Sequence, residues 1–154
     1  MICRGWQIFF HPLFAERFRI LRTEVEELKG RLPEAEFRAH PKARLVASLV
    51  RLIREIVPEN PNAPEFRLRD SLAKFRRAKS HGLPEQYRLF WVFSIKAMAI
   101  VFLYLNDEST LRKEGSRNDP YELFKAMLRQ GRLGENFEAN RTMINEMDRS
   151  QNPP

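Results

Sequence analysis

The most apolar stretch of the chain, QYRLFWVFSIKAMAIVFLYLND, covers residues 86–107. A membrane helix needs about 20 apolar residues without charge, but Lys96 interrupts this run and polar residues close both of its ends. Its many β-branched and aromatic residues favour strands, and residues 94–97, the least apolar part, favour a turn. The pattern therefore predicts a β-hairpin with strands at residues 87–93 and 98–105. Both strands are apolar on both faces, which is typical of central strands covered on two sides.

The N-terminal part of the chain predicts one strand and two helices. Residues 5–10, GWQIFF, form the strand, and Pro12 starts the first helix. Apolar residues then recur at helical spacing, first up to Gly30 and again between Pro41 and Pro58. The two apolar stripes are Phe14, Phe18, Leu21, Val25 and Leu28, and Leu45, Val46, Leu49, Leu52, Ile53 and Ile56. We expect these helices to form an antiparallel pair that lies on the sheet.

The segments around the hairpin carry weaker patterns. Residues 73–80, AKFRRAKS, can form a further strand beside the hairpin. A short helix is predicted between Asp119 and Gly131, because aspartate is a favoured N-cap, Pro120 suits the first helical position and glycine commonly follows a helix. Residues 133–154 are expected to form a tail that is weakly helical and then frayed.

The order of these elements predicts an α+β domain over residues 1–132, with a small sheet and helices packed on one face. A chain of 154 residues is long enough to bury a core without disulfides or metals. The single cysteine, Cys3, cannot form an internal disulfide, and no signal peptide is recognisable. These features predict a reducing compartment and a cytoplasmic location.

The net charge of +7 is concentrated in one short segment. Residues 67–88 hold 7 basic and 2 acidic residues, whereas residues 1–66 hold 11 and 9, and residues 89–154 hold 9 of each. A local basic cluster favours a polyanionic partner. The alternative is a basic surface that only meets solvent.

Common catalytic and cofactor motifs are absent. The three histidines, His11, His40 and His81, and Cys3 show no metal-ligand spacing, which argues against a closed zinc site. The sequence contains no P-loop, no dinucleotide-binding glycine motif and no nucleophile elbow. It therefore predicts neither a metal site nor a cofactor.

A set of basic and phenolic side chains remains as the candidate chemistry. If the basic segment is a strand, Arg77 and Lys79 share one face, and Lys74 and Arg76 share the other. Arg88 starts the neighbouring strand. The residues after the hairpin add Arg112, Lys113, Arg117 and Tyr121. Such groups can clamp a phosphodiester and neutralise the extra charge of its transition state. The general base stays open between a lysine of this set and a histidine in the following loop.

Four segments resemble a known family. They are RGWQIFFHPLFAERF, APEFRLRDSL, YRLFWVFSIKAMAIVFLYLND and ESTLRKEGSRNDPYELFKAMLRQG, within residues 4–131. They are similar to the YhaV family of bacterial toxins, in the RelE superfamily of toxin–antitoxin ribonucleases. The resemblance implies a small, mostly antiparallel sheet with two N-terminal helices. It also implies a metal-independent endoribonuclease that cleaves mRNA, with the ribose 2′-hydroxyl as nucleophile.

The resemblance also implies roles for individual residues. Arg88 would contact the scissile phosphate, with Arg77 and Lys79 as the basic pair on the preceding strand. Arg112 and Tyr121 fall where the superfamily places its late arginine and its tyrosine. The remaining candidates, expected to bind RNA, are Lys74, Arg76, His81, Lys113 and Arg117.

The partners implied by the resemblance are a cognate antitoxin of the PrlF type and mRNA, in several relatives on the ribosome. Operator DNA would be bound only through the antitoxin, and no membrane partner is expected. Two alternatives stay open. One is a non-catalytic RNA- or ribosome-binding module with the same basic face, and the other is a degenerate toxin that mainly assists its antitoxin in operator binding.

Overall fold

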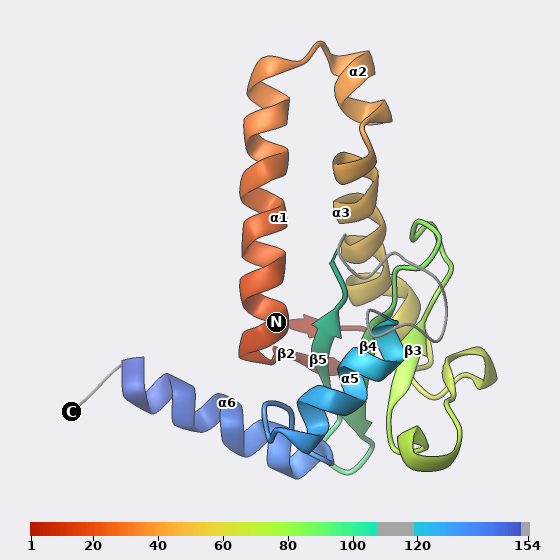
Figure 1. Cartoon of the computed structure of the whole chain (residues 1–154), viewed down its shortest axis with the longest axis vertical. Helices are drawn as coiled ribbons and strands as arrows, with labels where there is room; N and C mark the ends of the chain where they lie inside the picture. Colours follow the sequence, from red (N-terminus) through yellow and green to blue (C-terminus); the bar gives the residue numbers. More distant parts are fainter. Residues whose placement is uncertain (108–118, 152–154) are drawn as a thin grey trace.

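The computed structural model describes residues 1–107 and 119–151 and shows an α+β fold (Figure 1). A five-stranded sheet has the order β1-β2-β5-β4-β3. Its strands are β1 (Ile2–Cys3), β2 (Trp6–Phe10), β3 (Arg76–Ala78), β4 (Leu89–Ser94) and β5 (Ala99–Leu105). β2 pairs with β5 in parallel, and the other neighbouring strands are antiparallel. The sheet is therefore mixed. β2 can run parallel to β5 because the chain between these two strands is long and passes through the N-terminal helices, β3 and β4.

The predicted hairpin is confirmed. β4 and β5 pair in antiparallel fashion near the middle of the sheet, and the chain reverses through a turn at residues 95–98. In this turn the Ala97 N–H donates to the Ser94 hydroxyl at 3.1 Å. Most side chains of both strands are buried, as expected for strands that are covered on two sides.

β5 contains one residue more than its partner strand. Phe90 lies opposite Tyr104 and Trp91 lies opposite Phe102, so Leu103 is an extra residue between the two pairs. This is a β-bulge, which interrupts the alternation of side chains along a strand. As a result Leu103 and Tyr104 both face the same side of the sheet, where both pack in one hydrophobic cluster.

The N-terminal helices form an arm that rises from the sheet (Figure 1). The helices are α1 (Pro12–Arg31), α2 (Glu34–Ala39), α3 (Pro41–Arg51), a π-helical segment η1 (Leu52–Ile56) and α4 (Val57–Glu59). The predicted antiparallel pair is present as α1 and α3, but its far end stands clear of the sheet. The helix does not stop at Pro58, because the last turn continues to Glu59. Two short 3₁₀ helices, η2 (Pro64–Phe66) and η3 (Asp70–Leu72), lead to β3.

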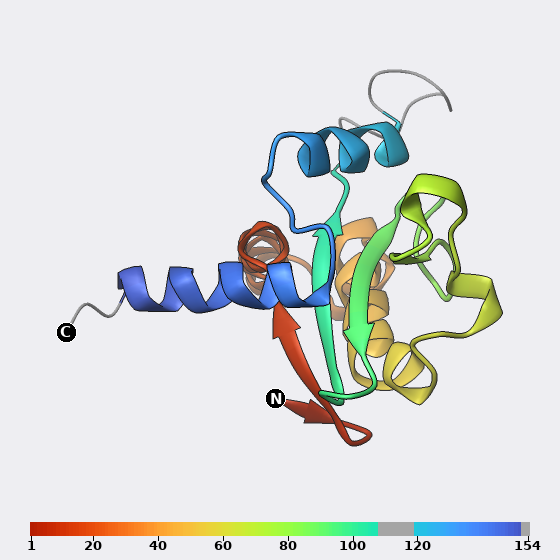
Figure 2. The same ribbon diagram turned by 90° about the horizontal axis from the view of Figure 1, so that it is seen from below.

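The two N-terminal helices pack on one face of the sheet, as predicted, but the C-terminal helices cover the other face, so the expectation that all helices lie on one face is wrong. The base of the arm packs on the face that carries Trp91 and Phe102. The opposite face carries Phe90 and is covered by α5 (Pro120–Arg129) and α6 (Phe137–Gln151). Figure 2 shows α6 lying across the strands with its C-terminal half projecting beyond them. The expectation was wrong because the sequence pattern does not show on which face of the sheet the C-terminal helices pack.

The ends of α5 follow the predicted signals. The Asp119 carboxylate accepts the Tyr121 backbone N–H at 2.8 Å and caps the helix. Gly131 has φ of +72° just after the helix, and its N–H donates to the Leu128 carbonyl at 3.1 Å. The tail that was expected to be weakly helical contains α6, a helix of 15 residues. No helix within the described residues is long and apolar enough to cross a membrane.

A buried histidine links α1 to α6. His11 is only 3% exposed, and its Nδ1 accepts the Leu13 N–H at 3.1 Å as the N-cap of α1. Its Nε2 lies 3.4 Å from the Met143 sulfur on α6. Because Nδ1 accepts, the proton of the neutral ring is on Nε2 and points to sulfur. Burial lowers the pKa of His11 to about 4.

This histidine predicts a loss of stability in acid. The folded state favours the neutral ring, so its contribution is present above the unfolded pKa of about 6.5 and is lost as the pH falls towards 4. At about 1.4 kcal/mol per pKa unit, the loss amounts to about 3 kcal/mol. Denaturant unfolding between pH 7 and pH 4 measures it. His11→Asn keeps a capping oxygen and should flatten this dependence.

The matched control is His40→Asn, since His40 caps α3 in the same way but is only half-buried. It should leave the pH dependence close to that of the wild type. An unaltered pH dependence in His11→Asn would show that other groups cause the acid sensitivity.

Candidate functional site

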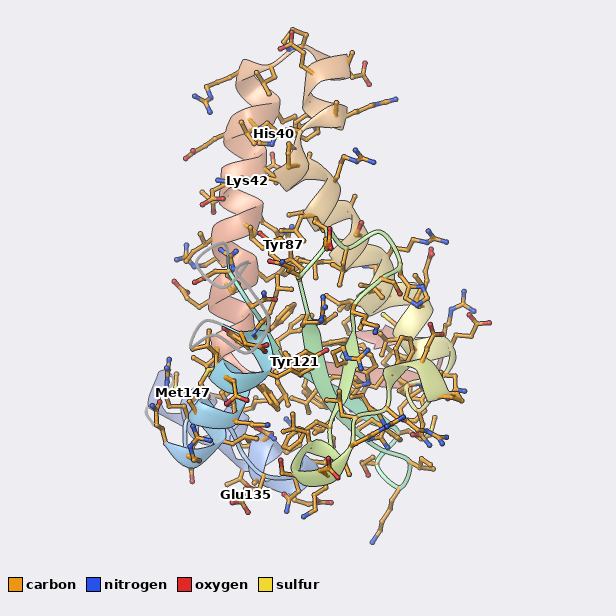
Figure 3. The ribbon with its side chains drawn as sticks, turned by 45° about the vertical axis from the view of Figure 1, so that its right-hand side comes forward. His40, Lys42, Tyr87, Tyr121, Glu135 and Met147 are labelled. Atoms are coloured by element: carbon orange, nitrogen blue, oxygen red, sulfur yellow. The ribbon has the colours of Figure 1, made fainter. Side chains whose placement is uncertain are left out.

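Two arginines, Arg77 and Arg88, meet Tyr121 at the start of α5. Figure 3 labels this tyrosine. The Arg88 Nε–H donates to the Tyr121 hydroxyl oxygen at 3.1 Å. The guanidinium carbons of Arg88 and Arg77 each lie 5.9 Å from the centroid of the Tyr121 ring. The edge of that ring contacts Phe90 on β4. Three of the residues that the sequence singled out are therefore brought together, from β3, the start of β4 and α5.

The strand pattern places Arg77 in this group. Arg77 lies opposite Phe90 in the β3–β4 pair, and Arg76 lies opposite Trp91. Phe90 and Trp91 belong to different faces of the sheet. The predicted separation of Arg76 from Arg77 is thus confirmed. β3 ends at Ala78, so Lys79 lies just beyond the strand, where it is exposed.

Arg88 is held at both its backbone and its side chain. Its N–H donates to the Asn106 side-chain oxygen at 2.7 Å, and its Nη1 donates to the Tyr87 carbonyl at 2.9 Å. Asn106 is fully buried, and its Nδ2 donates to the Gln86 carbonyl at 2.9 Å. Gln86 has φ of +72°, an uncommon backbone conformation for a residue with a side chain. Asn106 thus joins the end of β5 to the segment that presents Arg88.

The sequence analysis missed Asn106 as a positioning residue. Its one visible signal is a polar residue directly after an apolar strand, which is equally typical of a solvent-exposed strand end. The structure instead buries it against the start of β4.

Arg76 is held on the opposite face by its own neighbours. Its Nε donates to the Asn62 side-chain oxygen at 3.0 Å, and its Nη1 donates to the carbonyls of Ala73 and Phe75 at 2.9 and 2.8 Å. Its guanidinium also lies 5.4 Å from the Phe93 ring centroid. Burial, assisted by the charge of Arg67, lowers the pKa of Arg76 from its ordinary value.

His81 also lies away from Tyr121. Its Nε2 is 2.9 Å from a carboxylate oxygen of Glu65, and its ring is 5.8 Å from that of Phe66, which packs on Trp91. These contacts place His81 on the face that the arm covers. Lys74 is exposed near the far end of α5, in a shallow depression shared with Leu128 and Arg129. Arg112, Lys113 and Arg117 lie outside the described residues.

The cluster of Arg77, Arg88 and Tyr121 is electrostatically unbalanced. No salt bridge joins either arginine to a carboxylate within residues 1–107 and 119–148. The Nε of Arg77 is buried and has no hydrogen-bond partner in the same part of the chain. Such a buried donor is costly unless a ligand or another group satisfies it. The arrangement therefore fits an anion with several oxygens, such as a phosphodiester.

A metal site has no support in the part of the chain that the structure describes. There, no group of three or more His, Cys, Asp or Glu side chains could hold an ion. The donors that do converge are guanidinium N–H groups and a phenol, which bind anions rather than cations.

Comparison with known proteins identifies the family. A family model described as "Toxin with endonuclease activity, of toxin-antitoxin system" matches residues 8–145. The chain belongs to the YhaV toxin family. The Ribonuclease toxin YhaV of Escherichia coli strain K12 is 36% identical over 132 residues, which are 82% of this chain and 84% of that protein. The Toxin YhaV of Escherichia coli O6:H1 is 35% identical over 140 residues, which are 88% and 89% of the two chains.

No solved structure matches this YhaV-family chain. The match to the family model extends past residue 132 and into α6.

Asn106 predicts a stability effect that can be measured without any activity. Asn106→Ala removes the partner of the part-buried Arg88 N–H and Gln86 carbonyl, and each such group left unsatisfied costs about 1–3 kcal/mol. We therefore expect the free energy of unfolding to fall by at least about 2 kcal/mol in denaturant titrations. The exposed Asn145→Ala is the control and should stay within about 0.5 kcal/mol of the wild type. Equal free energies of unfolding for the two variants would show that Asn106 does not hold the start of β4 in place.

Proposed function

We propose that this chain is an endoribonuclease toxin that cleaves mRNA and inhibits translation. The observation that carries the proposal is the hydrogen bond from Arg88 to the Tyr121 hydroxyl, beside Arg77, whose buried Nε has no hydrogen-bond partner among the described residues. Family membership and the K12 relative, a ribonuclease toxin, support the same activity.

The proposed reaction is attack of a ribose 2′-hydroxyl on the adjacent phosphorus. The bond to the leaving 5′-oxygen breaks, and the products are a 2′,3′-cyclic phosphate and a 5′-hydroxyl. Arg88 and Arg77 would hold the phosphate oxygens and stabilise the charge that develops on them. The Tyr121 hydroxyl accepts a hydrogen bond from Arg88 and can donate its own proton to the leaving oxygen.

The donors still available on Arg88 suit a phosphate. Nε and one Nη1 hydrogen are used internally, and Nη2 has no partner among the described residues. The planar fork can therefore bind oxygen without giving up its present contacts. Since two hydrogen bonds already fix the side chain, little conformational entropy is lost when the phosphate binds.

The other candidates have less direct support as RNA contacts. Lys79 is exposed next to Arg77 and Lys74 is exposed near α5, so both can meet RNA backbone. Lys79 also remains a candidate general base, together with the groups outside the described residues. Arg76 and His81 already have internal partners on the other face, and the proposal does not depend on them.

The proposed partners follow from family membership. We infer a cognate antitoxin of the PrlF type that also binds operator DNA, mRNA as substrate with the ribosome as the site of action, and a cytoplasmic location. Membership of a toxin–antitoxin family supports the antitoxin. The alternative function, a non-catalytic RNA-binding module, uses the same guanidinium groups of Arg77 and Arg88.

The two functions differ in their products. An endoribonuclease yields fragments with cyclic phosphate ends, whereas a binding module retains intact RNA in a salt-dependent manner. Incubation of the purified chain with mRNA, in the presence and in the absence of ribosomes, followed by mapping of the new ends, separates them.

Arg88 gives the sharpest test of the mechanism. Arg88→Ala should lower the cleavage rate and the toxicity by roughly 10²–10³-fold, the effect of removing one donor to a developing oxyanion. Arg88→Lys should recover only part, because an ammonium lacks the planar fork. Single-turnover cleavage measures both variants, and denaturant unfolding checks that they are folded.

The exposed Arg44→Ala on α3 is a control of equal charge and should cleave as the wild type does. A folded Arg88→Ala protein that cuts RNA at the wild-type rate would exclude Arg88 from the reaction.

A further prediction concerns inhibition by the antitoxin. An acidic segment that covers Arg77 and Arg88 would block the phosphate site directly and satisfy the buried Arg77 Nε. Arg77→Ala should then weaken antitoxin binding at least tenfold, as measured by calorimetry, whereas Arg44→Ala should not. A complex in which Arg77, Arg88 and Tyr121 stay open to solvent would show that inhibition works in another way.

A further inference from the structure

An aromatic cluster at the base of the arm reaches the surface of the molecule. The ring centroids of Phe10 on β2 and Phe14 on α1 are 5.4 Å apart, and those of Phe14 and Phe18 are 5.6 Å apart. Phe14 is fully buried, whereas Phe10 and Phe18 are half-buried. The hydrophobic core on the arm side of the sheet therefore continues outwards to two partly exposed rings.

Two adjoining depressions meet over these outer rings. The first has a volume of about 500 Å³ and extends along α1 past Ala15. The second has a volume of about 350 Å³ and reaches α3 at Val50. Phe10, Phe18 and Arg22 line both depressions, so the two form one groove that runs from α1 to α3. The surface that lines this groove is mostly apolar.

The rim of the groove carries positive charge that is not compensated nearby. The guanidinium carbon of Arg22 lies 5.8 Å from the centroid of the Phe18 ring, and Arg54 lines the α3 side. Both arginines are exposed, and within residues 1–107 and 119–148 neither forms a salt bridge. Arg19 is already paired with a glutamate on α1, and Glu26 is the acidic residue of the lining. The local balance therefore favours a partner with negative charge.

The groove and the proposed phosphate site belong to different faces of the sheet. Phe10 packs against the cluster that contains Trp91, whereas Tyr121 packs against the cluster that contains Phe90. A ligand that is seated only in the groove therefore leaves the phosphate site open. Its occupant is not the phosphate that is cleaved.

The shape and chemistry of the groove fit an amphipathic helix. Such helices place their apolar face in a hydrophobic groove and keep polar residues at its edges. Partly exposed aromatic rings and arginines are the residue types that contribute most to protein–protein binding. Nucleic acid binding depends mainly on many phosphate contacts, whereas this groove offers two uncompensated arginines beside apolar side chains. A protein that neutralises a chain of net charge +7 is also expected to be acidic.

We propose that this groove binds an acidic amphipathic helix of the cognate antitoxin. The apolar side chains of the helix pack over Phe10 and Phe18. Its carboxylates pair with Arg22 and Arg54. The inference rests on the proposed function, in which this chain is a toxin with an antitoxin partner.

This anchoring contact differs from the segment that blocks the phosphate site. A helix that is anchored in the groove raises the effective concentration of an acidic segment linked to it. The two contacts therefore strengthen each other, although only one of them covers the residues proposed to act on RNA. Loss of the groove contact should weaken inhibition without changing the activity of the free chain.

Substitutions in the groove test the proposal with the purified cognate antitoxin as the probe. Arg22→Glu/Arg54→Glu should raise its Kd at least about tenfold in calorimetry, because like charges then face each other. Ala15→Trp fills the groove from an exposed position on α1 and should weaken binding to a similar extent. RNA cleavage by the free variants should stay within about twofold of the wild type, as for surface substitutions away from the site.

The matched controls are Arg31→Glu/Arg44→Glu and Ala47→Trp. They make the same changes at exposed positions of α1 and α3 that lie outside both depressions. Both controls should bind the antitoxin as the wild type does. Denaturant unfolding checks that every variant is folded.

Four results would contradict one of the two proposals. Wild-type affinity for the antitoxin in both groove variants would overturn the docking site. An equal loss in Arg31→Glu/Arg44→Glu would also overturn it, because only long-range attraction would then be at work. A loss of affinity for labelled RNA in fluorescence anisotropy, with antitoxin binding unchanged, would make the groove an RNA surface instead. A wild-type chain that binds the antitoxin through the groove but cuts no RNA would overturn the proposed function alone.

Discussion

The extra residue in β5 decides which side chains share a face of the sheet. Because side chains alternate along a strand, a shift of one residue moves every later side chain to the other face. Leu103 makes this shift in the most buried part of the molecule, and it brings Tyr104 over Phe90. It also sets the end of β5 so that Asn106 reaches the Arg88 backbone. The proposed scissile-phosphate site therefore depends on this bulge through Asn106.

The sheet divides the basic segment between two unlike environments. Arg76 and Arg77 are neighbours in sequence, yet the first is enclosed by Asn62 and backbone carbonyls while the second faces Tyr121. His81 is likewise bound to Glu65 on the arm side. The basic segment of the sequence therefore suggests a larger basic surface than a polyanion can reach, because some of its basic side chains form hydrogen bonds within the fold.

Local signals were sufficient for some elements and not for others. The hairpin and the Asp119 cap follow from apolar runs and residue preferences, and the alternation around Arg77 followed once β3 was placed. The parallel pairing of β2, the bulge and the partners of His81 depend on contacts between distant residues, which a single sequence does not display. α6 has few apolar positions, and its contacts are specific and distant, such as Arg141 lying 3.6 Å from the Phe9 ring centroid.

Two of the buried polar residues, Asn106 and Asp119, position groups that could act on RNA, instead of acting themselves. Asn106 fixes the backbone of Arg88, and Asp119 fixes the turn of α5 that presents Tyr121. Both residues form these hydrogen bonds inside the fold. The guanidinium and phenol groups are therefore already fixed in the free chain and lose little conformational entropy when a ligand binds. Among the described residues, the buried side-chain donors without a hydrogen-bond partner are the Nε atoms of Arg17 and Arg77. The free-energy cost of these unsatisfied donors in the free chain is offset when oxygen atoms of a ligand accept their hydrogen bonds. This favours a phosphate-rich ligand over a neutral one.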